Sequence, residues 1–402
     1  MNLKKVLRLA EEIEQQHAGE LEQISRYIFT HPELGMQERE SAAYLMDYMR
    51  RSGFAVQTAV CGMDTAFIAV FGSDGPQIDF PAEYDALPGY GGDGRSAAHA
   101  CGHNWIAATT CGAAVVMAEL VRRGEIRAVI RLVGTPAEES YGGKVIMARE
   151  GVFDDTAAAI QAHLHPKTNT ACRALAMNSF EFSYRGRAAH AAAAPWDGVN
   201  ALDAVQLLFA GVNALRQHVR PDVRMHGIVS DGGAAPNVVP ETAAAKFFVR
   251  AEQRTYLNEV IEKVKNIAQG AALMTGAALT VTEPDPPLDD LLPAPTLSRL
   301  GEAHLRAQGI EPDYTLDHPG PSSGSSDIGN VSHVCPTLYL EVAPPGAPVH
   351  VHTEQALSIV DGPQAHLALH AAVRAMTGVA LELLADRTLL KTVRDEFLQN
   401  RA

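Results

Sequence analysis

The chain has 402 residues, which is long enough for two domains with separate cores, and its 47% hydrophobic content is ordinary for a globular protein. Its formal net charge of −14 argues against nucleic acid and anionic membrane surfaces as partners, because both require a basic binding surface. Five scattered cysteines, an N-terminus without a signal peptide and the lack of an apolar run of membrane-spanning length predict a cytoplasmic protein with free thiols.

The first part of the chain alternates between helical patterns and short apolar strands. Apolar residues at helical spacing predict one or two helices over residues 3–29. The expected elements after them are a helix at 41–52, strands at 66–71 and 77–80, a helix at 105–121, and strands at 128–133 and 156–162. This order predicts an α/β domain with a mostly parallel sheet. Ligands of such sheets bind beyond the carboxyl ends of the strands.

A different pattern begins near residue 179. Apolar and polar residues alternate along 180–185, which is typical of a half-exposed strand. The expected elements after it are a helix at 202–215, strands at 224–229 and 243–251, a helix at 257–267 and a strand at 278–282. The order β-α-β-β-α-β predicts a ferredoxin-like antiparallel sheet with two helices on one face.

The α/β pattern resumes after a proline-rich linker at 284–287. A strand is expected at 337–342, and one long C-terminal helix is expected from Gln364 onward. We therefore expect a discontinuous larger domain formed by residues 1–178 and 287–402. A smaller domain is expected to be inserted into it at 179–286.

Two short segments about thirty-five residues apart carry the strongest chemical signal. The first contains Cys101 and His103, and the second contains the adjacent pair Glu138 and Glu139. Sulfur, nitrogen and oxygen donors together suit zinc, or manganese if the thiol binds weakly. One carboxylate of the pair can hold the metal while its neighbour takes a proton from the attacking water. The two segments therefore predict a hydrolase.

Further candidates lie at the ends of predicted elements. His163 and His165 follow a strand, and His350 and His352 lie in a loop rich in proline and glycine. Two metal ions about 3.5 to 4 Å apart would need a bridging ligand and two or three terminal ligands each, which this set can supply. Residues two apart on a strand point to the same face, so the spacing leaves each histidine pair open. Asp85 is either a turn former or a carboxylate that orients a metal ligand.

Short motifs occur in a fixed order over almost the whole chain. They are HPELG at 31–35, AEYDALP at 82–88, HACGHN at 99–104, GTPAEE at 134–139, AHA at 189–191 with PWDGVNA at 195–201, PNVVP at 236–240 and SSDIGNVS at 325–332. With these motifs the chain resembles metallopeptidase family 20. The branch that it resembles contains auxin-amino acid conjugate hydrolases, p-aminobenzoyl-glutamate hydrolase subunits and a β-alanyl-dipeptidase-like group. The resemblance implies a two-metal catalytic domain with an inserted lid or dimerisation domain, as the boundaries above predict.

The resemblance also implies a role for each matching residue of the larger domain. It makes Cys101 the bridging ligand of two divalent metal ions, and it makes Glu138 the general base. The terminal ligands that it implies are His103, Glu139, His163 and His352. His165 precedes a proline, as the ligand in the family often does, and His350 lies two residues from His352, so both alternatives stay open. Asp85 is expected to orient a ligand.

Three residues of the inserted domain receive roles from the same resemblance. His190 is implied to reach the metal site of a partner subunit and to stabilise the oxyanion there, which would make a homodimer part of catalysis. Asn237 is implied to help hold the reacting group. Arg250 is implied to bind the carboxylate of the substrate, which suits the geometry of a guanidinium.

The favoured hypothesis is a manganese- or zinc-dependent amidohydrolase that acts on a small molecule. The expected substrate is an N-acyl or N-aroyl amino acid, or a short dipeptide, with a free carboxylate. An alternative on the same scaffold is an aminohydrolase that attacks an aryl C–N bond and releases ammonia. A non-catalytic ligand-binding relative is disfavoured, because neither the base nor the bridging ligand has been lost.

Overall fold

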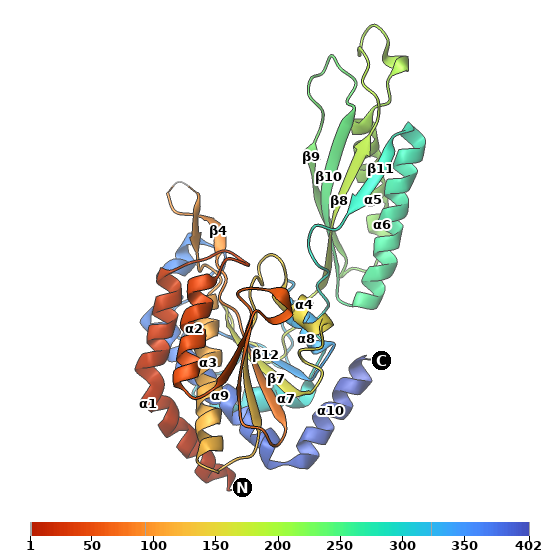
Figure 1. The fold of residues 1–402 in the computed structure, drawn as a ribbon. Coiled ribbons are helices and arrows are strands. Elements are labelled where there is room, and N and C mark those ends of the chain that lie inside the picture. The colour runs from red at the N-terminus through yellow and green to blue at the C-terminus, as the bar shows by residue number, and fades with distance from the viewer. Residues whose placement is uncertain (1, 93, 323, 402) are drawn as a thin grey trace. The chain divides into compact units, whose positions relative to one another are not determined.

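The computed structural model describes residues 2–92, 94–322 and 324–401, and the chain divides into two compact units. The large unit consists of Met1–Arg173 and Leu291–Ala402, and the small unit is Ala174–Asp290. The boundaries expected from the sequence, 179 and 286, lie a few residues inside the small unit. The chain therefore leaves the large unit once and returns to it (Figure 1).

A six-stranded sheet forms the centre of the large unit, in the order β1-β2-β6-β3-β7-β12. Its strands are β1 (Ala55–Thr58), β2 (Phe67–Phe71), β3 (Gln77–Ala82), β6 (Val129–Gly134), β7 (Thr156–Leu164) and β12 (Thr337–Val342). Strands β6, β3, β7 and β12 pair in parallel, whereas β1 and β2 pair antiparallel at one edge. The expected mostly parallel sheet is confirmed. A separate two-stranded ribbon consists of β4 (Leu87–Tyr90) and β5 (Ser96–Ala98).

Helices pack around this sheet. They are α1 (Leu3–Thr30), α2 (Arg39–Arg51), α3 (His103–Arg122), α4 (Gly143–Arg149), α7 (Pro295–Ala307), α8 (Ile328–Ser332), α9 (Pro363–Ala385) and α10 (Arg387–Arg401), with short 3-10 turns at Val60–Gly62 and Glu354–Ser358. The alanine-rich α3 is buried along almost its whole length and packs against α1, α9, β3 and β7. Small side chains allow this close packing of helix on helix and helix on sheet.

Two helices, α3 and α9, are long and apolar enough to cross a membrane by length and composition alone. The sequence pattern did not predict them as spans, because neither is a long uninterrupted apolar run. Most of each helix is buried inside the large unit, with 89% of the apolar window of α3 and 67% of that of α9 covered by protein. A helix at the centre of a protein core has the same composition, so this finding is weak evidence for a membrane span.

The C-terminal region differs from its expectation in one respect. The single long helix predicted from Gln364 is interrupted after Ala385, where Asp386 adopts an extended backbone conformation. The Asp386 carboxylate accepts a hydrogen bond from the backbone N–H of Thr388 at 2.8 Å. This is the contact of a helix N-cap, so α10 begins as a new helix.

The small unit contains the βαββαβ fold that the sequence predicted. Its elements are β8 (Ala176–Arg185), α5 (Ala201–Leu215), β9 (Arg224–Asp231), β10 (Thr242–Ala251), α6 (Arg254–Thr275) and β11 (Ala278–Thr282), with 3-10 turns at Pro195–Asp197 and Arg216–His218. The antiparallel sheet has the order β11-β8-β10-β9, and α5 and α6 pack on β8 and β10. Phe180, Phe182 and Tyr184 point into this core, as their period-two spacing indicated.

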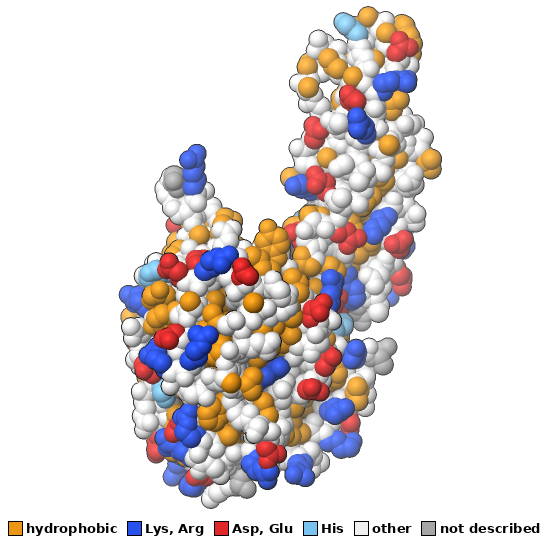
Figure 2. Space-filling model, in the orientation of Figure 1, with side chains coloured by type: hydrophobic (Ala, Val, Ile, Leu, Met, Phe, Trp, Pro, Cys, Tyr) orange, Lys and Arg blue, Asp and Glu red, His pale blue; other side chains and the backbone are white. Residues whose placement is uncertain are grey.

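Charged side chains of both signs are interspersed on the face of the molecule in Figure 2. On this face, lysine and arginine do not gather into one basic surface. This distribution fits the formal net charge of −14 and offers no basic footprint there for nucleic acid.

Candidate metal centre

A tight turn in front of α3 places Cys101 and His103 side by side. Gly102 caps the helix with a left-handed backbone at φ 82°, a conformation that glycine adopts without strain. Cys101 therefore lies just before the helix, and His103 is its first residue. Both side chains are buried, with exposed fractions of 8% and 0%.

A strained loop after β6 presents Glu138 and Glu139. Ala137 has a left-handed φ of 59°, which is unfavourable for a residue with a Cβ. The buried Glu38 holds this turn, because its Oε1 accepts a hydrogen bond from the Ala137 N–H at 2.8 Å. Burial raises the pKa of Glu38 to about 7. Strain held by surrounding contacts is common where side chains must be aimed at a site.

Two histidines from distant segments meet Cys101. His163, near the end of β7, places Nε2 3.5 Å from Cys101 Sγ. His352, in the loop after β12, places Nε2 3.2 Å from the same sulfur and 3.2 Å from Glu139 Oε1. Of the four donor groups within 4.8 Å in the described residues, one is His103 with Glu138 and Glu139, and one is Glu83 with Glu138 and Asp327. The two that contain Cys101 are Cys101 with His103 and His163, and Cys101 with Glu139 and His352. Cys101 belongs to both groups, as a bridging ligand must.

The alternative histidines lie elsewhere. The His165 ring contacts the backbone carbonyl of Lys167 at 3.3 Å and the carboxylate of Glu341 at 3.6 Å. Neither His165 nor His350 belongs to a donor group among the residues that the structure describes. The geometry thus brings His163 and His352 to the sulfur, and their role as ligands stays a prediction.

Asp85 contacts both halves of the site. Its Oδ1 lies 2.8 Å from His103 Nδ1, and its Oδ2 accepts the backbone N–H of Glu139 at 3.0 Å. A carboxylate at Nδ1 keeps the proton on that nitrogen, so the lone pair of His103 Nε2 is available to a metal. His163 Nδ1 faces the Leu164 carbonyl at 2.7 Å, which leaves His163 Nε2 available in the same way.

The electrostatics of this buried set fit a cation. Burial raises the pKa of Glu138 well above its usual range, and the charges of Glu83 and Glu139 add to the effect. Burial lowers the pKa of His163 to about 4, so its ring is neutral at pH 7. Burial and the charge of Glu139 raise the pKa of Cys101. A divalent ion offsets the cost of buried thiolate and carboxylate and requires neutral imidazole. The donors present therefore fit a metal site.

Known proteins resemble the chain over most of its length. Residues 176–273 match the peptidase dimerisation domain of the M20 family. The chain is 32% identical over 409 residues to the Xaa-Arg dipeptidase of Mus musculus, and the match covers 97% of this chain and 91% of the mouse protein. The chain belongs to the M20 metallopeptidase family.

Other M20 relatives match parts of the sequence or the fold. A p-aminobenzoyl-glutamate hydrolase polypeptide of Escherichia coli is 37% identical over 268 residues, which cover 63% of this chain and 55% of that protein. The Bacillus subtilis YXEP protein, described as a dinuclear metal binding peptidase from the M20 family, superposes with a TM-score of 0.71. That match covers 92% of this chain and 99% of the YXEP chain. Because the sequence identity is only 21%, the match shows a shared fold and no more.

The M20 site contains a buried charge cluster that sequence reasoning missed. Lys144, on α4, has no exposed surface and pairs with Glu83 Oε1 at 2.6 Å and Asp327 Oδ1 at 2.5 Å. Burial opposes charge on Glu83, but the positive charge of Lys144 outweighs it, and the pKa of Glu83 is lowered to about 2. A signal for Glu83 existed, because it lies two residues from Asp85 at the end of the same strand. Lys144 had no such signal, since a single lysine in a sequence is usually at the protein surface.

The remaining predicted residues of this M20 protein lie in the small unit. His190 is exposed, and its Nδ1 accepts the backbone N–H groups of Ala192 at 3.2 Å and Ala193 at 3.1 Å. Asn237 lies beside it, because its carbonyl accepts the N–H of Ala191 at 3.0 Å. Arg250 is on β10, with its guanidinium over the ring of Phe248. The roles of His190, Asn237 and Arg250 stay predictions.

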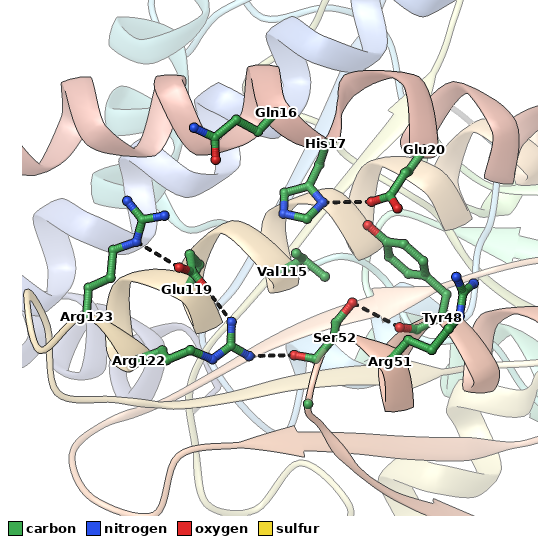
Figure 3. A pocket seen from close by; sticks show the side chains of 11 residues that line it. Gln16, His17, Glu20, Tyr48, Arg51, Ser52, Val115, Glu119, Arg122 and Arg123 are labelled. Carbon is green, nitrogen blue, oxygen red and sulfur yellow. Dashed lines mark hydrogen bonds and ion pairs between the residues drawn. The ribbon is translucent and has the colours of Figure 1, made fainter.

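A cavity of about 400 Å³ lies at the opposite end of α3 from His103 (Figure 3). Its lining includes Arg122 and Arg123, which both pair with Glu119 in the same pocket, and His17, which pairs with Glu20. Arg122 is nineteen residues along α3 from His103, or roughly 28 Å at the helical rise. This cavity is therefore separate from the donor groups at the start of α3. Figure 3 draws the ion pairs of Glu119 with Arg122 and Arg123 and of His17 with Glu20.

Proposed function

We propose that this protein is a dinuclear metal-dependent amidohydrolase. Its expected substrates are N-acyl or N-aroyl amino acids, or short dipeptides, with a free carboxylate. The observation that carries the proposal is the sharing of Cys101 Sγ by two donor groups with Glu138 beside them. The mouse relative is named a dipeptidase and the Escherichia coli relative a p-aminobenzoyl-glutamate hydrolase, which supports the same substrate class.

The residues divide naturally between two ions. His103 and His163 would hold one, Glu139 and His352 the other, and Cys101 both. The mixture of sulfur, nitrogen and oxygen donors favours zinc, with manganese as the alternative. When bound, the ions would acidify a water molecule and polarise the amide carbonyl of the substrate.

Glu138 is suited to move the proton. Its carboxylate oxygen lies 4.0 Å from His103 Nε2, next to the donor groups. Burial and the neighbouring carboxylates raise the pKa of Glu138, so this group can accept a proton from water and keep it. The same group can then protonate the departing nitrogen, which a permanently ionised carboxylate would do poorly.

His190 is suited to stabilise negative charge on the carbonyl oxygen. Because its Nδ1 accepts two backbone N–H groups, the proton of the neutral ring is on Nε2. An exposed loop therefore presents an N–H donor, which an oxyanion requires. We propose that this donor acts in the site of a partner subunit within a homodimer, as the match to a peptidase dimerisation domain supports.

Two further side chains of the small unit are proposed to bind the substrate. Asn237 lies in the segment that pairs with the His190 loop, because its neighbour Val238 forms a β-bridge with His190. Arg250 carries the planar pair of donors that a substrate carboxylate would accept.

The five cysteines of the chain are all free, which supports the proposal of a reducing, cytoplasmic location.

A substrate panel tests the function. The protein is freed of metal, reloaded with Zn²⁺ or Mn²⁺, and incubated with N-acetyl, N-benzoyl and N-p-aminobenzoyl amino acids and with dipeptides. Matched methyl esters block the free carboxylate, and electron-poor anilines test for ammonia release. Mass spectrometry of the products is expected to show amide cleavage that weakens at least about tenfold when the carboxylate is blocked. Ammonia release from the anilines without amide cleavage would establish the aminohydrolase alternative.

A further inference from the structure

Glu83 lies against the metal centre with one oxygen engaged and one available. The side chain is 1% exposed and follows directly after β3. Its Oε1 accepts hydrogen bonds from Lys144 Nζ at 2.6 Å and Gln161 Nε2 at 2.7 Å. Its Oε2 is buried and has no hydrogen-bond partner among the described residues. This second oxygen lies 3.4 Å from His103 Nε2, which likewise has no hydrogen-bond partner in the described part of the chain.

Two buried acceptors that face each other need something positive between them. Asp85 keeps the proton of His103 on Nδ1, so Nε2 presents a lone pair to the carboxylate of Glu83. A charge-assisted hydrogen bond between the two groups would bring them to about 2.7–2.9 Å. Two ligands of one tetrahedral ion, with bonds of about 2.0–2.1 Å, are instead about 3.4 Å apart. The observed 3.4 Å separation matches the second arrangement.

The surroundings fix Glu83 in this orientation. Lys144 is itself held, because Asp327 Oδ1 accepts its Nζ at 2.5 Å and Asp327 Oδ2 accepts its backbone N–H at 2.9 Å. Gln161, on β7, holds Oε1 from the other side. With Oε1 tied to two donors, rotation of the carboxylate is restricted and Oε2 stays directed at His103. A buried lysine also balances the charge that an additional carboxylate brings to the site.

We propose that Glu83 is a further ligand of the ion held by His103, His163 and Cys101, and that Lys144 and Gln161 position it. The inference rests on the dinuclear site of the proposed function. It gives that ion a complete set of four protein donors, as in tightly held zinc sites. The group of Cys101, Glu139 and His352 supplies three donors and is more open, since the His352 side chain is 52% exposed. The two ions should therefore differ in affinity, the one beside Glu83 being the tighter.

Glu83→Gln and Asp327→Asn form a matched pair for the test. Both substitutions remove one buried negative charge that pairs with Lys144, but the oxygens of Asp327 are both engaged by Lys144. The metal-free proteins are titrated with Zn²⁺ against a chromophoric chelator, and bound zinc is counted by elemental analysis after desalting. Wild type should bind two ions with distinct affinities. Glu83→Gln should weaken the tighter one by about 100-fold or more, since even partners outside the coordination shell are worth 10–100-fold. Asp327→Asn, which acts on Glu83 only through Lys144, should weaken it less, by about tenfold at most.

The other outcomes are equally distinct. Wild-type zinc affinity in Glu83→Gln, or equal losses in both variants, would reduce Glu83 to a counter-ion of Lys144 and overturn the inference. Absence of zinc binding by the wild type would instead contradict the proposed function itself. If Glu83→Gln does not fold by circular dichroism, Glu83→Asp replaces it. The shorter aspartate side chain keeps a negative charge near Lys144 but does not reach His103. The Glu83→Asp protein should therefore fold and still lose the tightly bound ion. Unchanged zinc affinity in this variant would also overturn the inference.

Discussion

His103 Nδ1 lies 2.8 Å from Asp85 Oδ1, and the other oxygen of Asp85 accepts the backbone N–H of Glu139. One buried carboxylate thus contacts one residue from each of the two donor groups that contain Cys101. Asp85→Asn should keep the shape but lose the charge that favours the Nδ1-protonated ring. We expect zinc affinity to fall about 10–100-fold, as measured by chelator competition. An unchanged affinity would show that Asp85 only shapes the turn.

Glu138→Gln should remove the proton acceptor and leave the metal ligands in place. The expected result is a fall in kcat of about 10²- to 10⁴-fold, the usual worth of general acid–base catalysis. Zinc content and thermal unfolding should match wild type, which separates the loss from misfolding. Activity within a few-fold of wild type would exclude Glu138 from proton transfer.

His163 near the end of β7 and His165 just after that strand form a matched pair. His163 Nε2 lies 3.5 Å from Cys101 Sγ, whereas the His165 ring contacts Lys167 and Glu341. His163→Ala should therefore lower zinc occupancy after dialysis, and His165→Ala should retain it. Elemental analysis of both variants decides between them, and the reverse result would assign the ligand role to His165.

His190→Ala tests whether the small unit acts in a partner's site. Loss of one oxyanion donor should lower kcat by about 10²- to 10³-fold, with zinc content and dimer mass unchanged. Mixing His190→Ala with Glu138→Gln subunits should then restore activity, because one site of each heterodimer receives both functional groups. If isotope-labelled subunits are shown by mass spectrometry to exchange and no activity returns, His190 does not act across the interface.

His370 should make stability depend on pH. Its hydrogen bond with the buried Glu14, at 2.6 Å, raises its pKa above the ordinary 6.5, although burial opposes this, and Glu22 contributes through a 3.1 Å contact. The folded state therefore favours protonated His370. That contribution is fully present below pH 6.5 and is lost as the pH rises through the folded-state pKa.

Thermal unfolding of wild type and His370→Gln checks this pH dependence. The Tm advantage of wild type should be largest near pH 6 and smallest near pH 9. His17→Gln, which removes a ring that pairs with Glu20 at the surface, is the matched control. A Tm difference that does not change with pH would contradict the assignment.

Local patterns were sufficient for the elements and for much of the site. The alternation along 180–185 fixed which faces of β8 are buried, because side chains on a strand alternate whatever packs on them. The spacing of Cys101 and His103 placed both in one turn, and the adjacent Glu138 and Glu139 predicted a base beside a ligand. The break at Asp386 was missed, because the apolar spacing of α9 continues into α10 while one capping contact ends the helix.

Only the tertiary structure distinguished residues that the local rules treat alike. His163 and His165 face the same side of the chain in an extended strand, and their difference lies in distance from the turn before α3, which packing determines. Glu83, Lys144 and Asp327 come from three separate segments. The sequence around each of them does not indicate that its charged side chain is buried. A buried charge is tolerated only where an opposite charge is brought to it, so the assembled fold decides that these three residues lie at the metal centre.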